Sequence, residues 1–344
     1  MENKKWLKLL PLLAAAVMLI CRVLGKSGGD YEDTIAVLTK ENPEAVVTVG
    51  VWENGEAAYR VFGENGKELP KELHTYAIGS ITKTFTGSLI AKQVEDGKLE
   101  LECPISDYLK MSAQTYAPTI KQLVTHTSGL SDEWERALEG NPETAFNRAA
   151  MVELFEKQGL LETEYEPYYS NFGAALAGSV AAEIEQKTYE AAMNEYISQD
   201  LRLQNTKVGG NGDLDNYWNW KSGDEMMGAG AVTSNVIDLL EYGRLHMQEE
   251  LPHLRLTHEP QSQFTEDYDC GYFWLIDKEN GMIWHNGELA MENDNGEEVG
   301  FQAFLGFSKT SNRVVVVLSN IIAYDEDENA YTDLLGYQLM ESGL

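Results

Sequence analysis

The chain has 344 residues, of which 43% are apolar and 24% are charged, a composition typical of globular proteins. This length suffices for one large domain or two intergrown ones. With 26 basic and 56 acidic residues the net charge is −30, so the chain repels nucleic acid and we expect no nucleic-acid partner. At long range such a chain favours neutral or cationic partners.

The N-terminus has the features of a targeting segment. Lysines precede an uninterrupted apolar run from Leu9 to Cys21, which is shorter than the roughly 20 residues that span a bilayer. This run fits the apolar core of a signal peptide, although no clean cleavage site follows it. We therefore predict that residues 1–29 are a signal peptide or an uncleaved N-terminal membrane anchor. The body, residues 30–344, is then exported to the cell surface or beyond.

Two cysteines, Cys103 and Cys270, lie in the body of the chain. Export permits a disulfide, but two cysteines this far apart in sequence do not by themselves argue for one. Two buried free thiols are the favoured prediction, and pairing stays open. The six histidines are scattered without a metal-binding spacing, and no phosphate-binding glycine loop is present, so we expect neither a metal nor another cofactor.

The first elements after the leader are a short helix and a pair of strands. Residues 31–40 have a helical pattern and residues 45–52 are rich in strand-forming side chains. Asn54-Gly55 then predicts a two-residue hairpin, with the chain returning over 56–62. A mostly helical part follows from about 81 to 234. Its clearest helices are expected over 149–158, 171–187 and 189–201, and another helix follows it over 234–247.

Strand patterns return near the C-terminus. The expected strands cover residues 272–276, 282–285, 299–307 and 313–319, and a closing helix covers 330–340. This order predicts one antiparallel sheet assembled from both chain ends, about 30–80 and 235–344. The fold class is thus α/β of the α+β kind, with helices flanking the sheet and a mostly helical part inserted at about 81–234.

The first candidate catalytic motif is Ser80-Ile81-Thr82-Lys83. A serine hydroxyl is a weak nucleophile unless a nearby base takes its proton. Positions i and i+3 of a helix lie on the same side, so Lys83 can reach the Ser80 hydroxyl. Ser80 begins the helical pattern, so its backbone N–H is free to bind an oxyanion. Alone, this tetrapeptide is weak evidence, because a serine that only caps a helix, followed by a solvated lysine, has the same sequence pattern.

The second motif is Tyr169-Ser170-Asn171, which directly precedes a helical pattern. A tyrosine hydroxyl near the nucleophile can relay protons to a leaving group. An asparagine amide can hold the lysine and a substrate amide by hydrogen bonds. Tyr217-Trp218-Asn219 matches the same pattern, so this motif is also weak by itself.

The third motif is His285-Asn286-Gly287 at the end of a predicted strand. Alternation along a strand places His285 and Gly287 on one face and Asn286 and Glu288 on the other. A strand edge at this point can bind the substrate backbone, and the Glu288 N–H is a candidate second oxyanion donor. Lys221-Ser222-Gly223 competes for this role but has no strand before it, so we favour residues 285–287.

Taken together in this order, the motifs resemble the serine β-lactamase and penicillin-binding protein superfamily, in its class C β-lactamase-like branch. Ser80 and Lys83 match its S-x-x-K motif, Tyr169 and Asn171 its Y-x-N motif, and His285 and Gly287 its H/K-x-G strand motif. The stretches Leu123-Val-Thr-His-Thr-Ser-Gly-Leu and Gly228-Ala-Gly-Ala-Val-Thr-Ser resemble the same family. We interpret His126 and Ser128 in the first of these stretches as structural.

The resemblance implies a β-lactamase/transpeptidase-like fold and an exported serine acyl-hydrolase. Ser80 would form the acyl-enzyme, with Lys83 and Tyr169 moving protons. Asn171, His285, Gly287 and Glu288 would bind the substrate. That substrate would be a small molecule or a cell-wall peptide: a β-lactam, a D-alanyl peptide, an ester or an amide. The alternative is a non-catalytic, penicillin-recognising sensor or binding protein at the cell surface.

Two features depart from the family pattern. His285 replaces a more familiar lysine, so a cation is expected there only below about pH 6.5. Residues 288–298 form a longer and more acidic link than usual to Gly300-Phe301. Its acidic residues are expected to crowd the rim of the site and to weaken recognition of penicillin and D-alanyl peptides: Glu288, Glu292, Asp294, Glu297 and Glu298.

Overall fold

The computed structural model describes residues 30–111, 117–130, 147–157, 167–293 and 295–344. In these ranges the main sheet consists of β1 (Val47–Glu53), β2 (Glu56–Phe62), β3 (Glu68–Leu69), β7 (Ser262–Gln263), β8 (Tyr268–Cys270), β9 (Leu275–Asp277), β10 (Ile283–Glu292), β11 (Glu298–Ser308) and β12 (Arg313–Ser319). The strands are antiparallel and lie in the order β3-β2-β1-β12-β11-β10-β9-β8-β7. Both chain ends therefore contribute to one sheet, and the predicted fold class is confirmed.

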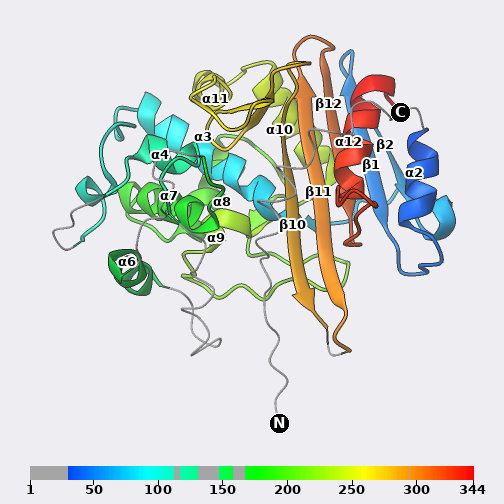
Figure 1. The fold of residues 1–344 in the computed structure, drawn as a ribbon, viewed down its shortest axis with the longest axis horizontal. Coiled ribbons are helices and arrows are strands. Elements are labelled where there is room, and N and C mark those ends of the chain that lie inside the picture. The colour runs from blue at the N-terminus through cyan, green and yellow to red at the C-terminus, as the bar shows by residue number, and fades with distance from the viewer. Residues whose placement is uncertain (1–29, 112–116, 131–146, 158–166, 294) are drawn as a thin grey trace.

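Helices cover both faces of this sheet (Figure 1). The α-helices in the described ranges are α2 (Tyr31–Leu38), α3 (Thr82–Glu95), α4 (Ile120–Val124), α6 (Arg148–Lys157), α7 (Asn171–Ile184), α8 (Tyr189–Gln199), α9 (Met227–Gly230), α10 (Val236–Met247), α11 (Pro252–Thr257) and α12 (Tyr331–Ser342). In Figure 1, α2 and α12 lie on one side of the sheet and the block around α3, α7 and α8 on the other. A second sheet, β4 (Tyr76–Ala77), β6 (Val232–Ser234) and β5 (Lys207–Val208), was not predicted because its strands are too short to show a pattern.

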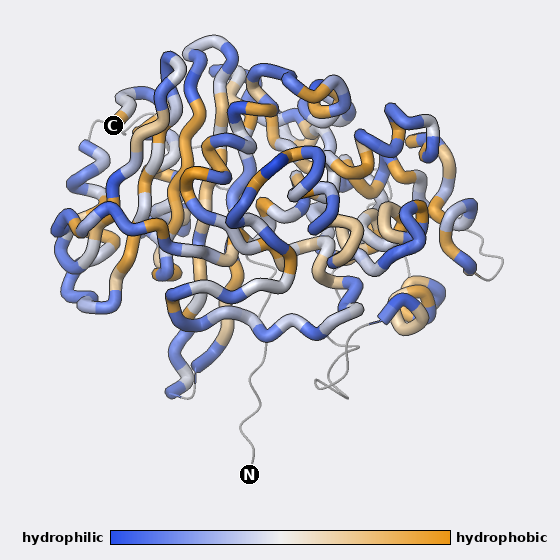
Figure 2. The backbone as a smooth tube through the Cα atoms, turned by 180° about the vertical axis from the view of Figure 1, so that it is seen from behind, coloured by the Kyte–Doolittle hydropathy of each residue, from blue (hydrophilic) through white to orange (hydrophobic). Residues whose placement is uncertain are grey.

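Alternation along the central strands supplies the two cores. In β12, Val314 and Val316 pack into the larger core shared with α3 and α10, whereas Val315 and Val317 pack under α2 and α12. Successive side chains of a strand point to opposite faces, so a strand buried on both sides is apolar throughout. Figure 2 shows the corresponding concentration of hydrophilic residues in the peripheral loops.

Local sequence accounts for the first hairpin. Asn54 and Gly55 both have positive φ, 54° and 89°, as the favoured two-residue hairpin turn requires. The turn sets Glu53 opposite Glu56, and the register continues to Val47 opposite Phe62. The predicted returning strand over 56–62 therefore has the bounds that the structure gives.

The strand predicted over 272–276 is shorter than expected. The structure begins β9 at Leu275 because the preceding backbone binds the helical block instead of a neighbouring strand. Tyr272 N–H donates to Thr257 O, Phe273 N–H donates to Val124 O, and Phe273 has a φ of 65°. Conversely, β10 extends well past the predicted His285, to Glu292, so most of the expected acidic link is strand.

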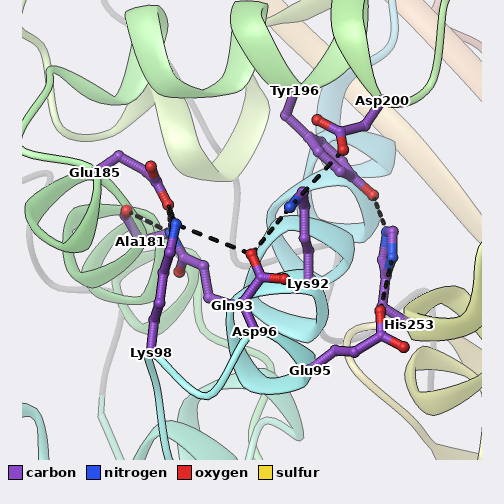
Figure 3. A network of polar contacts seen from close by, with 10 residues as sticks. All are labelled: Lys92, Gln93, Glu95, Asp96, Lys98, Ala181, Glu185, Tyr196, Asp200 and His253. Atoms are coloured by element: carbon purple, nitrogen blue, oxygen red, sulfur yellow. Dashed lines mark hydrogen bonds and ion pairs between the residues drawn. The ribbon is translucent and has the colours of Figure 1, made fainter.

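A network of polar side chains fixes the C-terminal part of α3, which is remote from Ser80 (Figure 3). Lys92 lies 3.0 Å from Asp96 and 3.8 Å from Asp200, and Gln93 Nε2 donates to Ala181 O. Lys98 also pairs with Glu185 at the end of α7. The helix that begins with the candidate catalytic motif is thereby tied to α7 and α8.

Several predictions concern the leader and the cysteines. Residues 1–29 lie outside the described residues, so export and anchoring stay predictions. Among the described residues, no helix has the length and apolarity needed to cross a membrane. Cys103 and Cys270 are both free thiols; Cys270 is buried, as favoured, but Cys103 is only partly buried.

Candidate active site

Ser80 and Lys83 meet at the start of α3. Ser80 lies in a short 3-10 turn, η3 (Gly79–Ile81), that continues directly into α3, and Lys83 lies in the first turn of that helix. Lys83 Nζ donates to Ser80 Oγ at 2.8 Å and to Ala229 O at 2.8 Å. Ser80 is 4% exposed and Lys83 is 0% exposed. A lysine amine held this close to a serine hydroxyl is placed to take its proton.

The turn that holds Ser80 is built by backbone contacts that need small residues. Gly79 has a φ of 49°, and a Cβ there would lie 2.5 Å from both the N and the O atoms of Glu288. The Ile78 N–H donates to Val232 O, and the Thr82 hydroxyl accepts from Val232 N–H at 3.0 Å. These bonds fasten the turn to β6 on one side, and the glycine at position 79 lets it lie against β10 on the other.

Tyr169 and Asn171 enter the site from the segment that leads into α7. Ser170 caps this helix, since its Oγ accepts from Gly173 N–H at 2.9 Å. The Tyr169 ring lies beside Lys83, whose Nζ is 5.0 Å from the ring centroid. Asn171, the first residue of α7, is buried. The structure thus brings the second motif next to the first.

His126 contacts the segment that carries Tyr169 and Ser170. Its ring stacks on the Tyr169 ring with centroids 4.5 Å apart, and its Nδ1 accepts from Ser170 N–H at 3.2 Å. Burial, together with the nearby Lys83 and His285, holds the pKa of His126 well below its usual value. A neutral ring that accepts a backbone hydrogen bond fits the predicted structural role.

The third motif reaches the site along the edge of β10. Strand β9 pairs only with Ile283 and Trp284, so the next residues of β10 face η3 instead of a strand. A Cβ on Gly287 would lie 1.9 Å from Ile78 O and 3.1 Å from Ser80 N. Only glycine permits this approach, which sets the backbone of residues 287–288 against the Ser80 turn.

His285 is neutral in this environment. It is fully buried, and burial together with the charge of Lys83 lowers its pKa to about 3. The main-chain oxygen of Asn286 accepts from His285 Nδ1 at 2.5 Å, which fixes the proton on that nitrogen. The cation expected at this position below pH 6.5 is therefore absent throughout the physiological range.

The expected acidic rim is wrong for Glu288. Its side chain lies on the face of β10 opposite to His285, where it accepts from Gln302 Nε2 at 2.9 Å and from the Tyr324 hydroxyl. Strand alternation is the cause, since residues 286 and 288 share the face that packs under α12. Further along β10, Glu292 lies opposite Glu298 in the backbone register with β11, near the end of the hairpin. Asp294 lies outside the described residues.

The two competing motifs lie differently. Tyr217 donates its hydroxyl to the main-chain oxygen of Thr75, and its ring packs on Phe301 with centroids 4.8 Å apart. Lys221 is exposed in the same loop. The Ala229 carbonyl, in contrast, is a partner of Lys83 that the sequence did not single out, because a main-chain oxygen leaves no side-chain signature; the only hint was the resemblance of residues 228–234.

A metal site needs several ligand side chains held close together. In the ranges that the structure describes, no group of three or more histidine, cysteine, aspartate or glutamate side chains is placed to hold a metal ion. The roles assigned to the site residues stay predictions, although their proximity is now a structural fact.

Comparison with known proteins identifies the family. A sequence profile of the Beta-lactamase family matches residues 33–337. The chain is 28% identical to a β-lactamase of Providencia stuartii over 238 residues, 64% of this chain and 60% of the relative. It is 27% identical to a teichoic acid D-alanine hydrolase of Staphylococcus aureus over 166 residues, 46% of this chain and 40% of the relative. A class C β-lactamase crystal structure shares the fold, with a TM-score of 0.70, 18% identity and coverage of 91% and 96%.

The matched parts span 60%, 49% and 53% of the lengths of three curated relatives, so the likeness does not extend over these whole proteins. The family profile, however, covers the strands and helices that build the site, from α2 to α12. The chain therefore belongs to the β-lactamase family.

Proposed function

We propose that this protein is a serine acyl-hydrolase that works through an acyl-enzyme on Ser80. The observation that carries the proposal is the 2.8 Å hydrogen bond between Lys83 Nζ and Ser80 Oγ, both buried at the start of α3. Membership of a family that includes hydrolases supports it. An exposed lysine beside a serine would be an ordinary surface pair, but here both groups are withdrawn from water.

In the first step the Ser80 oxygen attacks the substrate carbonyl while its proton passes to the Lys83 amine, which accepts it in its unprotonated form. The negative charge that develops on the carbonyl oxygen is held by the backbone N–H groups of Ser80 and Glu288. Tyr169, beside the Lys83 amine, passes a proton to the leaving group as the tetrahedral intermediate collapses. Water then attacks the acyl-enzyme by the same route in reverse and releases the acid.

We propose further that the substrate is an ester or amide without a carboxylate next to the scissile bond. A neutral His285 offers no cation to such a carboxylate. The net charge of −30 disfavours anionic substrates at long range and favours neutral or cationic ones. Slow turnover of β-lactams and D-alanyl-D-alanine peptides is the consequence.

The test of the nucleophile compares Ser80→Ala with the matched control Ser198→Ala, an exposed serine on α8. With an activated ester, the Ser80 variant should lose turnover and should show no acyl adduct by intact-mass spectrometry. The control should keep both. Turnover retained by Ser80→Ala would contradict the proposal, whereas a stable adduct on Ser80 without turnover would indicate a binding or sensing protein.

The test of the substrate class is a panel on the wild-type protein: an activated ester, a chromogenic cephalosporin and a D-alanyl-D-alanine peptide. We expect kcat/KM for the ester to exceed the other two by more than tenfold. A cephalosporin rate equal to the ester rate would overturn this part of the proposal and leave the Ser80 mechanism intact.

A further inference from the structure

A buried pair of polar side chains lies on the face of β10 turned away from Ser80. Asn286, between the two site residues of the third motif, donates from Nδ2 to Asp333 Oδ2 at 2.8 Å. Asn286 is 6% exposed, and Asp333, in the first turn of α12, is 3% exposed. This bond ties the strand segment of the site to the C-terminal helix.

The amide oxygen of Asn286, Oδ1, and the other carboxyl oxygen of Asp333, Oδ1, are buried without a hydrogen-bond partner among the described residues. Buried polar atoms are rarely left unpaired, because each costs about 1–3 kcal/mol. An ionised carboxylate can only accept hydrogen bonds and so cannot satisfy the amide oxygen. A proton on Asp333 Oδ1 would satisfy both atoms at once, closing a cyclic pair of a carboxylic acid and an amide.

We propose that Asp333 is kept as a neutral carboxylic acid that pairs with Asn286 through two hydrogen bonds, and that this pair positions the strand segment carrying Gly287 and the Glu288 N–H. Asp333 is thus a positioning residue for the oxyanion donor, and this role, unlike the protonation itself, rests on the proposed function. Above neutral pH the proton leaves Oδ1 for solvent, the second bond is lost, and a negative charge appears behind the oxyanion site.

The surroundings of Asp333 support a neutral carboxyl. Burial, with a smaller contribution from nearby Glu288, raises its pKa to about 7, and the Asn286 bond opposes this only in part. The start of a helix favours an anion, but burial outweighs it. The other ionisable groups around it are Tyr324, bonded to Glu288, and Tyr337 on α12, both with a raised pKa. In the part of the chain that the structure describes, no cationic side chain contacts this carboxyl.

The effect on catalysis follows from charge. For scale, a unit charge about 10 Å from a developing anion slows formation of that anion on the order of tenfold at an effective dielectric of about 20. Since Asp333 is neutral below its pKa and charged above it, the penalty is absent at pH 5.5 and complete by pH 8.5. Glu288 lies on the same face and also has a raised pKa through burial, so Glu288→Gln serves to separate its contribution.

The first experiment measures kcat/KM for an activated ester between pH 5.5 and 8.5. Asp333→Asn replaces the acid by an amide that can both donate to Asn286 Oδ1 and accept from Nδ2, without titrating. The ratio of this variant to wild type should be near one at pH 5.5 and should rise toward tenfold at pH 8.5. Asp327→Asn, an exposed aspartate in the loop before α12, is the matched control and should give a ratio near one throughout.

The second experiment is independent of activity. Infrared difference spectra of the wild-type protein between pH 5.5 and 8.5 should show the loss of one buried protonated carboxyl band, and Asp333→Asn should lack it. A band that persists in Asp333→Asn, or no band in wild type, would overturn the proposal whether or not that variant folds well. If the band behaves as expected while Ser80 proves inert, the acid–amide pair stands and the proposed function fails. A rate ratio that does not change with pH would refute the positioning role.

Discussion

Replacing Gly287 by alanine is the sharpest perturbation of the proposed oxyanion site. The new Cβ would lie 1.9 Å from Ile78 O, whereas ordinary contact begins at 3.4 Å, so strand and turn must separate by up to 1.5 Å. Neither atom belongs to a flexible side chain, and both backbones are fixed by hydrogen bonds to β11 and β6. The separation therefore falls on the gap between Ser80 and the Glu288 N–H.

A shift of this size removes a hydrogen bond to the oxyanion, because donors act within about 2.7–3.1 Å. Loss of one such donor costs about 10²–10³ in kcat, or about 2.7–4 kcal/mol of transition-state stabilisation. The overpacked contact also lowers the free energy of unfolding of the Gly287→Ala variant by about 1–3 kcal/mol. The rate effect thus exceeds any plausible loss of folded protein.

The assay is single-turnover acylation by an activated ester, with the folded fraction checked by urea denaturation. Gly281→Ala is the control, because it lies in the turn before the same strand, has a φ of 72° and has open space around its Cβ. It should lose about 1 kcal/mol of stability through backbone strain and keep its rate. A Gly287→Ala protein that acylates within threefold of wild type would refute the assignment of the Glu288 N–H.

Three further substitutions probe the site. Lys83→Met should leave Ser80 without its base and lower the acylation rate by at least about 10²-fold, measured by rapid-quench mass spectrometry, and an unchanged rate would assign the base elsewhere. His285→Lys should raise the ratio of cephalosporin to ester kcat/KM, since it supplies a cation for a carboxylate; an unchanged ratio would show that substrate class is set elsewhere. Thr82→Val should leave the buried Val232 N–H unpaired and lower the free energy of unfolding by about 1–3 kcal/mol in urea.

The sequence predicted those features that depend on pattern and short range. The Asn54-Gly55 turn, the helix that follows Ser80 and the helix after Asn171 were all found from residue type and periodicity. Ser80 and Lys83 were expected to meet because three residues of helix bring two side chains together. The approach of His285 to Ser80 and Lys83 is a contact between residues far apart in sequence, and only the order of the motifs indicated it.

The features that sequence missed depend on tertiary contact. The strand expected from Tyr272 fails because the backbone N–H groups there bind the helical block. Glu288 does not join the expected acidic rim, because strand alternation turns its side chain to the face of β10 opposite to His285, where it bonds to Gln302. The lowered pKa of His285 has no signal in the sequence, since burial and the proximity of Lys83 are properties of the fold.

His285 of β10 and Asp333 of α12 are buried on opposite faces of β10. They give the free energy of unfolding opposite dependences on pH. His285 has a folded pKa of about 3, below the unfolded 6.5, so its contribution is present above pH 6.5 and is lost as the pH falls toward 3. Asp333 has a folded pKa of about 7, above 3.8, so its contribution is present below pH 3.8 and is lost as the pH rises to 7. At about 1.4 kcal/mol per unit, these are on the order of 5 and 4 kcal/mol.

Between about pH 4 and 6.5 the two groups change the unfolding free energy of the wild-type protein with pH by similar amounts in opposite directions. Their contributions therefore cancel, and only variants reveal them. Relative to wild type, Asp333→Asn should gain unfolding free energy as the pH rises through this window, and His285→Gln should lose it. Urea denaturation at half-unit pH steps measures both differences, and the contributions of the other titrating groups drop out of each. If the unfolding free energies of both variants, taken relative to wild type, changed with pH in the same direction, one of these two groups would not be neutral in the folded protein.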